Sequence, residues 1–192
     1  HSNLRRQRQM CIRDRAKGLM KGFEVPFFNY KIEDWEHKKS LLMNLCYDAN
    51  FYQDKKTNVY TDYGNNNDYK YEVVDILKSD INNFHNDIDV DTVYVSDLWF
   101  QKYKSGQFHA THNHGALGYS SILFLKYDKT IHKATRFLSP FMNPKGETDT
   151  YIPDVDEGTI IFFPSMINHY TIPNQTDKTR IVLSFNLKET NI

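Results

Sequence analysis

The sequence predicts an α+β protein that is mainly β, in which the strands form a double-sheet jelly roll and two N-terminal helices pack against one sheet. The first reason is the order of the patterns: two segments with helical spacing of apolar residues precede residue 90, and short β-type runs follow it. The second reason is that these runs are rich in Val, Ile, Tyr, Phe and Thr and are separated by turn-like segments. A chain of 192 residues suits one domain with a sizeable core.

The N-terminal stretch differs in charge from the remainder of the chain. Residues 1–21 hold seven Lys and Arg residues against one Asp, so they carry +6 and residues 22–192 carry −6. We expect residues 1–21 to be a disordered basic tail or a cloning remnant, and residues 22–192 to be one domain whose jelly-roll core spans about 90–188. The mildly acidic body argues against nucleic-acid binding. No apolar run reaches the length of a membrane span, so we expect a soluble, cytoplasmic protein without a membrane partner.

The segments before residue 90 are expected to form one strand and two helices. Residues 22–32 have the pattern of a strand that Pro26 restricts to an edge or to the strand's start. Helical spacing predicts helices at 33–49 and 71–87, and the Asn- and Gly-rich stretch 58–70 between them is expected to be a loop. The apolar stripe of the second helix consists of Val73, Val74, Leu77, Ile81 and Phe84. The loop has three tyrosines that either pack at the core edge or line a substrate cleft, namely Tyr60, Tyr63 and Tyr69.

Five β-type runs after residue 90 are expected to supply the two sheets. They lie at 92–103, 119–127, 134–139, 158–164 and 179–187. Because loops on a rigid scaffold carry specificity, we expect the loop 58–70 and the segment 139–153 to shape the open end of the jelly roll.

The stretch "QFHATHNHGALGYSS" (107–121) holds three of the eight histidines, and it is the first candidate for a metal site. In a strand, residues two apart face the same way, so His112 and His114 are expected to project together and His109 to project oppositely. We therefore predict that His109 packs or lines a substrate cavity. A lone His-x-His is equally consistent with two histidines that form hydrogen bonds in a loop.

A third ligand has to come from another part of the chain, and His169 is the candidate because it follows a strongly apolar strand and a Pro. The remaining histidines, His1, His37, His85 and His132, lack such a setting. In the last strand, Arg180 and Ser184 share a face with Val182. A buried Arg is costly unless it meets an anion, which indicates a carboxylate-bearing ligand. The alternative is an exposed Arg at the start of a strand.

Three segments resemble the 2-oxoglutarate/Fe(II)-dependent oxygenases, most closely the prolyl 4-hydroxylase-related branch found in marine bacteria and their phages. They are "YKSGQFHATHNHGALGYSSILFLKYD", "EGTIIFFPSMINHYTIPN" and "RIVLSFN", and the resemblance covers roughly residues 92–188. It implies a double-stranded β-helix, the cupin-like form of the jelly roll, in the cytoplasm of a bacterial or phage-infected cell. The residues implied for Fe(II) are His112, His114 and His169, those for 2-oxoglutarate are Arg180, Ser184 and Tyr103, and the three histidines with Arg180 form the catalytic set.

The activity that the resemblance implies is hydroxylation of an unidentified peptidyl or small-molecule substrate, with dioxygen as cosubstrate and decarboxylation of 2-oxoglutarate to succinate. The middle ligand position departs from the family pattern, because His114 stands where a carboxylate is usual. Three neutral histidines with one open position also describe a catalytic zinc centre. The oligomeric state is left open, a homodimer included.

Other interpretations of the same architecture remain. Gly106 and Gly158 lie at the spacing of the two cupin motifs, which suggests a three-His cupin that binds zinc or iron without 2-oxoglutarate chemistry. The cupin Glu is missing, and Asp154 and Asp156 have the setting of solvated turn residues. A binding jelly roll with a structural metal is a non-enzymatic alternative. A halogenase pattern would take His114 as the first ligand and place Ala116 in the carboxylate position.

Overall fold

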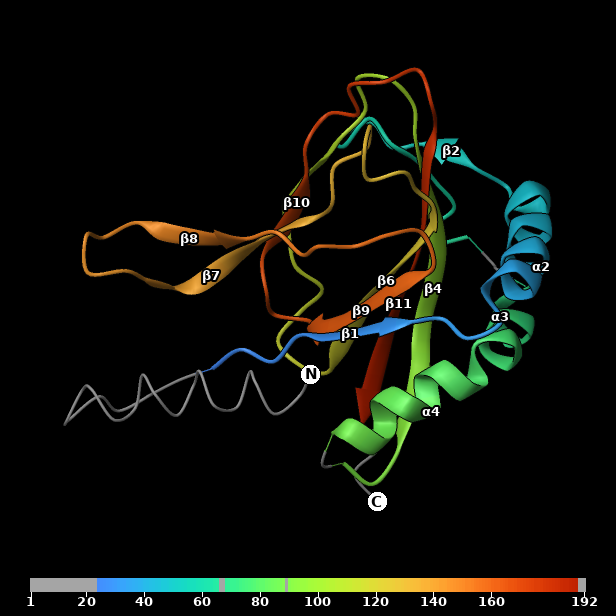
Figure 1. Cartoon of the computed structure of the whole chain (residues 1–192), viewed down its shortest axis with the longest axis horizontal. Coiled ribbons are helices and arrows are strands. Elements are labelled where there is room, and N and C mark those ends of the chain that lie inside the picture. The colour runs from blue at the N-terminus through green and yellow to red at the C-terminus, as the bar shows by residue number, and fades with distance from the viewer. Residues whose placement is uncertain (1–23, 66–67, 89, 190–192) are drawn as a thin grey trace.

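Two antiparallel sheets form the body of the molecule in the computed structural model, which describes residues 24–65, 68–88 and 90–189. The larger sheet has the order β1-β9-β6-β11-β4-β3-β2, with bounds Phe28–Lys31, Thr159–Pro164, Tyr119–Lys126, Arg180–Glu189, Val93–Tyr103, Tyr60–Thr61 and Tyr52–Gln53. The smaller sheet has the order β5-β10-β7-β8, with bounds His109–His112, His169–Thr171, Arg136–Met142 and Thr148–Tyr151. This arrangement confirms the predicted jelly roll (Figure 1).

Strand alternation divides the core into two apolar clusters, one on each face of the larger sheet. Leu183 and Phe185 of β11 belong to the cluster beneath the helices. Val182, between Arg180 and Ser184 on the other face, belongs to the cluster that contains Phe137 of β7 in the smaller sheet. The inner face of β11 therefore points between the sheets, and it carries two of the residues that the sequence selected.

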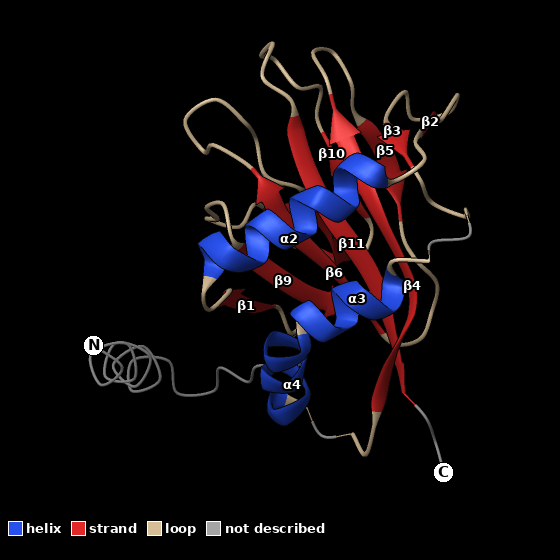
Figure 2. Cartoon of the chain, turned by 90° about the vertical axis from the view of Figure 1, so that its right-hand side faces the viewer, coloured by secondary structure: helices blue, strands red, loops and turns tan. Residues whose placement is uncertain are grey.

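Three helices cover the outer face of the larger sheet (Figure 2): α2 (Trp35–Asp48), α3 (Lys70–Ile76) and α4 (Lys78–Asp87). Helix α2 confirms the helix predicted at 33–49. The single helix expected at 71–87 is wrong, because the chain bends at Leu77, where φ is −97° and ψ is 11°. Leu77 is fully buried and its N–H still donates to the Val73 carbonyl at 3.0 Å. The bend thus keeps the apolar stripe on the sheet, and no Gly or Pro in the sequence signals it.

At one edge of the larger sheet the structure agrees with the prediction from sequence, and at the other edge it differs. β1 pairs only with β9, which is the edge position expected for the strand after Pro26. The stretch 58–70 is not a loop throughout, because Tyr60 and Thr61 form β3 and pair with Lys102 and Gln101 of β4. Residues 1–21, expected to be a tail or remnant, lie outside the described residues.

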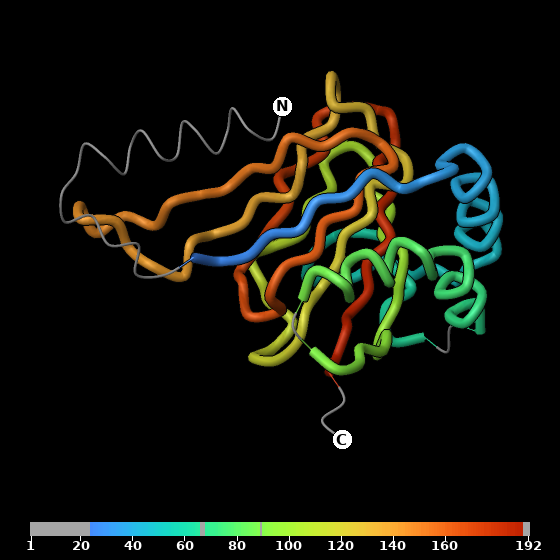
Figure 3. The backbone as a smooth tube through the Cα atoms, turned by 60° about the horizontal axis from the view of Figure 1, so that its bottom comes forward, coloured from blue at the N-terminus to red at the C-terminus, as the bar shows by residue number. Residues whose placement is uncertain are grey.

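The segment 139–153 forms the outer part of the β7–β8 hairpin of the smaller sheet, which extends away from the rest of the molecule (Figures 1 and 3). Gly146, with a φ of +77°, donates its N–H to the Asn143 carbonyl and closes the turn. None of the residues of 139–153 lines the histidine cavity described below. The prediction that this segment shapes the open end is therefore wrong. Among the described helices, none is long and apolar enough to cross a membrane.

Candidate metal centre

The three histidines selected from the sequence come together at one end of the space between the sheets. His112 ends β5, His114 follows it in the connecting loop, and His169 begins β10. One ligand atom from each lies within 4.8 Å of the others. Two backbone contacts fix this arrangement: His169 is the cross-strand partner of His112, and the N–H of His114 donates to the Ser165 carbonyl at 2.9 Å.

Hydrogen bonds at Nδ1 determine which nitrogen of each ring is free. Nδ1 of His112 lies 2.8 Å from the Ala110 carbonyl, and Nδ1 of His169 lies 3.0 Å from the Ile167 carbonyl. Nδ1 of His114 lies 2.7 Å from Oδ1 of Asn186. Because each of these oxygens can only accept, each Nδ1 carries the proton and each Nε2 keeps its lone pair. All three rings therefore present Nε2 as the potential ligand atom.

Burial favours the neutral form of these rings. It lowers the pKa of His112 and of His114 below the usual value and holds the pKa of His169 well below it. His169 is 4 % exposed, the least of the three. A metal ion needs neutral imidazoles, so the histidines are in the binding-competent protonation state at neutral pH.

His109 does not project away from the other two histidines of its stretch, as strict alternation predicted. Its ring stacks on that of His112 with the centroids 3.9 Å apart. The cause is a register shift between β5 and β10: His112 pairs with His169, but His109 pairs with Thr171, so β5 holds one residue more than its partner. This bulge turns His109 to the cavity side, and Gln101 Nε2 lies 3.1 Å from its Nδ1.

A cavity of about 350 Å³ opens in front of the histidines. Tyr63 and Trp99 contribute its aromatic wall, with an edge-to-face contact at 4.9 Å between centroids. Tyr69 instead packs against Phe100, so of the tyrosines in the stretch 58–70 one lines the cavity and one packs on the core. Ala116 is exposed and absent from the cavity lining, which gives no support to the halogenase pattern.

Arg180 lies beside the inner end of the same space and is 2 % exposed. Its Nη1 donates to the Lys133 carbonyl at 2.6 Å, and its Nη2 donates to Thr171 Oγ1 at 3.2 Å. Its Nε has no hydrogen-bond partner. Within the described part of the chain no carboxylate forms an ion pair with it. Burial lowers the pKa of Arg180, but a guanidinium stays charged in proteins, so an uncompensated cation is held here.

Tyr103 and Ser184 line the inner cavity next to Arg180. Tyr103 is the cross-strand partner of Arg180, and the guanidinium carbon lies 4.1 Å from the centre of its ring. The Tyr103 hydroxyl donates to Gln101 Oε1 at 3.2 Å. The inner cavity measures only about 10 Å³, so a dicarboxylate enters only if side chains such as Gln101 change rotamer.

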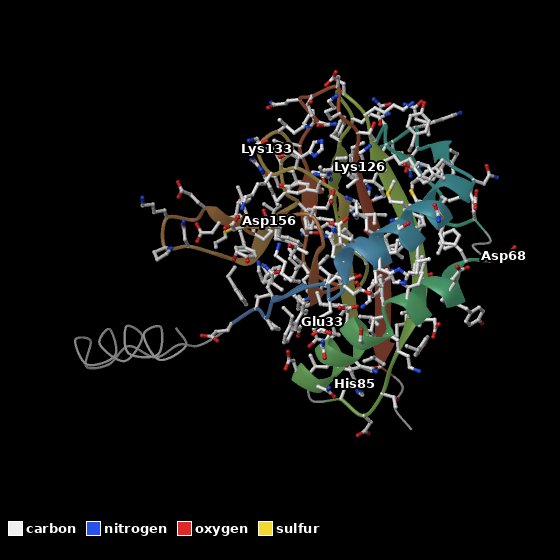
Figure 4. The ribbon with its side chains drawn as sticks, turned by 45° about the vertical axis from the view of Figure 1, so that its right-hand side comes forward. Glu33, Asp68, His85, Lys126, Lys133 and Asp156 are labelled. Atoms are coloured by element: carbon white, nitrogen blue, oxygen red, sulfur yellow. The ribbon has the colours of Figure 1, made fainter. Side chains whose placement is uncertain are left out.

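The remaining described histidines lie outside the cluster. His85 is on α4, at the lower edge of the molecule in Figure 4, and its Nε2 lies 3.1 Å from the Val90 carbonyl. His132 is buried rather than in an open turn: the Asp128 N–H donates to its Nδ1, and its Nε2 lies 3.1 Å from the Lys178 carbonyl. Asp156 pairs with Lys31 and Lys129, as expected of a solvated turn residue.

Sequence reasoning missed residues that the structure brings to the site. Asn186 contacts His114, and it belongs to the same alternating face as Arg180 and Ser184, so extending that pattern by two residues would have found it. Trp99 and Gln101 could have been found in the same way from Tyr103. Thr171 carries no comparable signal, because its role depends on how β10 packs against Arg180.

The fold and site together define a jelly-roll protein with three convergent histidines. Residues 97–186 match the model of a family described as putative 2OG-Fe(II) oxygenase. No curated protein matches the chain. The match of residues 97–186, over a little less than half of the chain, is to the same family that the sequence resembles, the 2-oxoglutarate/Fe(II)-dependent oxygenases.

Solved structures with the same fold include prolyl hydroxylases. A prolyl-4-hydroxylase from Pseudomonas putida matches with a TM-score of 0.61 at 11% identity, over 86% of this chain and 94% of that one. A viral collagen prolyl hydroxylase from Paramecium Bursaria Chlorella virus-1, in complex with 2OG, matches with a TM-score of 0.56 at 16% identity, over 85% of this chain and 97% of that one. HygX from Streptomyces hygroscopicus, with nickel, 2-oxoglutarate and hygromycin B bound, matches with a TM-score of 0.64 at 10% identity, over 86% of this chain and 84% of that one.

Proposed function

We propose that this protein is a 2-oxoglutarate- and Fe(II)-dependent dioxygenase that hydroxylates a small-molecule or peptide substrate. One observation carries the proposal: three neutral, convergent histidines line the inner cavity, and Arg180 contacts two other residues of its lining, Tyr103 and Thr171. Arg180 is buried and has no ion-pair partner among the described residues. The histidines suit a divalent metal, and the arginine suits a carboxylate. A ligand that chelates a metal at one end and has a carboxylate at the other complements both, and 2-oxoglutarate is such a ligand.

The chain's own residues bind and orient in this proposal. Nε2 of His112, His114 and His169 would hold the metal on one side and leave the other side open. Arg180 would bind the far carboxylate through charge-assisted hydrogen bonds, for which its unpaired Nε is available. The ring of Tyr103 packs against the guanidinium group. The hydroxyl groups of Tyr103 and Ser184 would add hydrogen bonds to the same anion.

Bound iron and 2-oxoglutarate supply the oxidising chemistry, in which dioxygen is consumed and 2-oxoglutarate is converted to succinate and carbon dioxide. The protein excludes water at the inner end, where Tyr103, Thr171 and Val182 are buried. The outer cavity beside Tyr63 and Trp99 is where the substrate would bind. A carboxylate ligand would neutralise part of the metal's charge, whereas His114 is neutral. The dianionic cosubstrate would therefore compensate more of that charge here than in a site with a carboxylate ligand.

The test is an anaerobic titration of the metal-free protein with Fe(II) and 2-oxoglutarate, followed by visible absorption. The chelate should give a weak charge-transfer band at one equivalent of each, and admission of air should then produce succinate. The absence of a band, together with stoichiometric zinc binding and no succinate, would favour a zinc or cupin-type centre instead.

A further inference from the structure

A row of polar side chains crosses three neighbouring strands directly behind His114. Asn186 of β11 is the cross-strand partner of Asp97 of β4 on one side and of Ser120 of β6 on the other. Its Nδ2 donates to Asp97 Oδ2 at 3.4 Å, and its Oδ1 accepts from the Ser120 hydroxyl at 2.9 Å. The same Oδ1 lies 2.7 Å from His114 Nδ1. The row thus connects a carboxylate to an imidazole through one amide.

The hydrogen-bond chemistry fixes the direction of this connection. A carboxylate can only accept, so the amide nitrogen of Asn186 faces Asp97 and the amide oxygen faces His114. That oxygen has two lone pairs, one for the Ser120 hydroxyl and one for Nδ1–H of His114. Ser120 is held in turn by Ser165, whose hydroxyl lies 2.9 Å away. The Ser120 oxygen also lies 3.0 Å from His114 Nδ1. Asn186, with Ser120 beside it, therefore fixes both the tautomer and the orientation of the ring, which Trp99 flanks at 5.4 Å between centroids.

The other two histidines of the cluster are held differently. His112 and His169 each place Nδ1 against a backbone carbonyl two residues earlier in the chain. Only His114, of these three, is connected to a carboxylate through a side chain. His114 is also the one that stands where the family usually has a carboxylate ligand. The departure at the ligand position thus coincides with an anionic connection immediately behind it.

We propose that Asn186 is the positioning residue for His114, and that Asp97 acts through it to return part of the negative charge that a carboxylate ligand would have supplied. The inference rests on the proposed function, because it assumes that His114 Nε2 binds a metal. Hydrogen bonding at the second ring nitrogen orients a ligating imidazole and increases its basicity, and removal of such a partner commonly costs 10- to 100-fold in metal affinity.

Metal affinity, measured without 2-oxoglutarate, tests this inference. Co(II) binding would be followed by competition with a chelator and by the visible spectrum of the bound ion. We expect Asn186→Leu to weaken Co(II) binding by about 10- to 100-fold and to shift the spectrum, because the oriented acceptor is lost. Asn186→Asp should bind Co(II) at least as tightly as the wild type, because an acceptor remains and becomes anionic. The Co(II) affinity of Asp97→Asn should lie between those of the wild type and Asn186→Leu.

Ser121→Ala is the matched control, because Ser121 is the neighbour of Ser120 on β6, is fully buried, and donates its hydroxyl to the Phe185 carbonyl at 3.3 Å, away from His114. It should leave Co(II) affinity unchanged, whereas Ser120→Ala should weaken it. Wild-type affinity and an unchanged spectrum in Asn186→Leu would overturn the inference while leaving the proposed function intact. An equal loss in Asn186→Asp and Asn186→Leu would also overturn it, because it would indicate a structural role only. A wild-type protein that binds no divalent metal would overturn both proposals.

Discussion

The two ends of the inner space differ in charge: the histidine end is neutral, whereas the arginine end is cationic. At one end, burial keeps the three imidazoles neutral, with the pKa of each below its usual value. At the other, Arg180 keeps its charge and is stabilised by a backbone carbonyl, a threonine hydroxyl and the ring of Tyr103. Among the described residues, no carboxylate forms an ion pair with Arg180 or with the three histidines. A metal at the first end would add to the positive charge, so the missing negative charge has to arrive with the ligand.

The largest effect is expected at the histidine end. His169→Ala should reduce Fe(II) affinity by more than about 100-fold, because it removes the most buried of the three ligands and leaves only two imidazoles. The metal content of the protein after loading under anaerobic conditions measures this. His85→Ala, on α4 outside the cluster, is the control and should load like the wild type. Full loading of His169→Ala would contradict the assignment of this ligand.

The arginine end should behave in the opposite way. Arg180→Ala should weaken 2-oxoglutarate binding by about 100-fold, since two charge-assisted hydrogen bonds are each worth about 1.5 kcal/mol or more, and it should leave Fe(II) binding nearly unchanged. The 2-oxoglutarate affinity of Arg180→Lys should lie between those of the wild type and Arg180→Ala, because an ammonium keeps the charge but loses the planar fork. Calorimetric titration of each ligand separately measures both affinities. An equal loss of metal and 2-oxoglutarate binding would remove the distinction between the ends.

Acidification should affect the histidine end only. Burial, and then the neighbouring His112, lower the pKa of His109 to about 3, whereas an unfolded His has a pKa of about 6.5. Between these values the unfolded chain binds the proton and the folded chain does not, so stability falls as the pH decreases below about 6.5. At pH 5 this histidine alone should cost about 2 kcal/mol of the free energy of unfolding of the metal-free protein.

Urea unfolding of the metal-free protein at pH 7.5 and pH 5 measures that loss, and His109→Gln should reduce it. The buried guanidinium cannot lose its proton in this range, and it makes only the smallest contribution to the lowered pKa of His109, so Arg180→Ala should reduce the difference between the two pH values only slightly. A free energy of unfolding that is the same at both pH values in the wild type would show that burial does not hold the histidines neutral.

The smallest effect is expected at His109. His109→Ala should change Fe(II) affinity by less than about threefold, because the three ligand atoms that converge belong to other residues. It should instead change the affinity for the substrate, since His109 lines the outer cavity. A loading assay in which His109→Ala fails to bind metal would move His109 into the ligand set.

Alternation along the strands made much of this site predictable. Period two placed Arg180 and Ser184 on the inner face of β11, and the apolar strand before His169 placed that residue at the same end as His112. Apolar spacing predicted α2 for the same reason, because regular elements repeat their environment. Sequence reasoning therefore succeeded wherever a residue's surroundings are set by its own element.

It failed where the surroundings are set by a neighbouring element. The bulge that turns His109 into the cavity depends on how β5 pairs with β10, and nothing in "HATHNH" signals an extra residue. The bend at Leu77 depends on the sheet beneath it. Asn186 was within reach of alternation, but its contact with His114 joins residues 72 apart in the chain.

The central claim is that one ligand spans the two ends of the inner space, and a crystal grown without oxygen in the presence of Fe(II) and 2-oxoglutarate tests it most directly. Anomalous scattering on both sides of the iron edge would identify the metal. The account predicts an iron peak among Nε2 of His112, His114 and His169, with continuous density from that peak to the guanidinium of Arg180. A zinc signal at the histidines, with no density reaching Arg180, would contradict it.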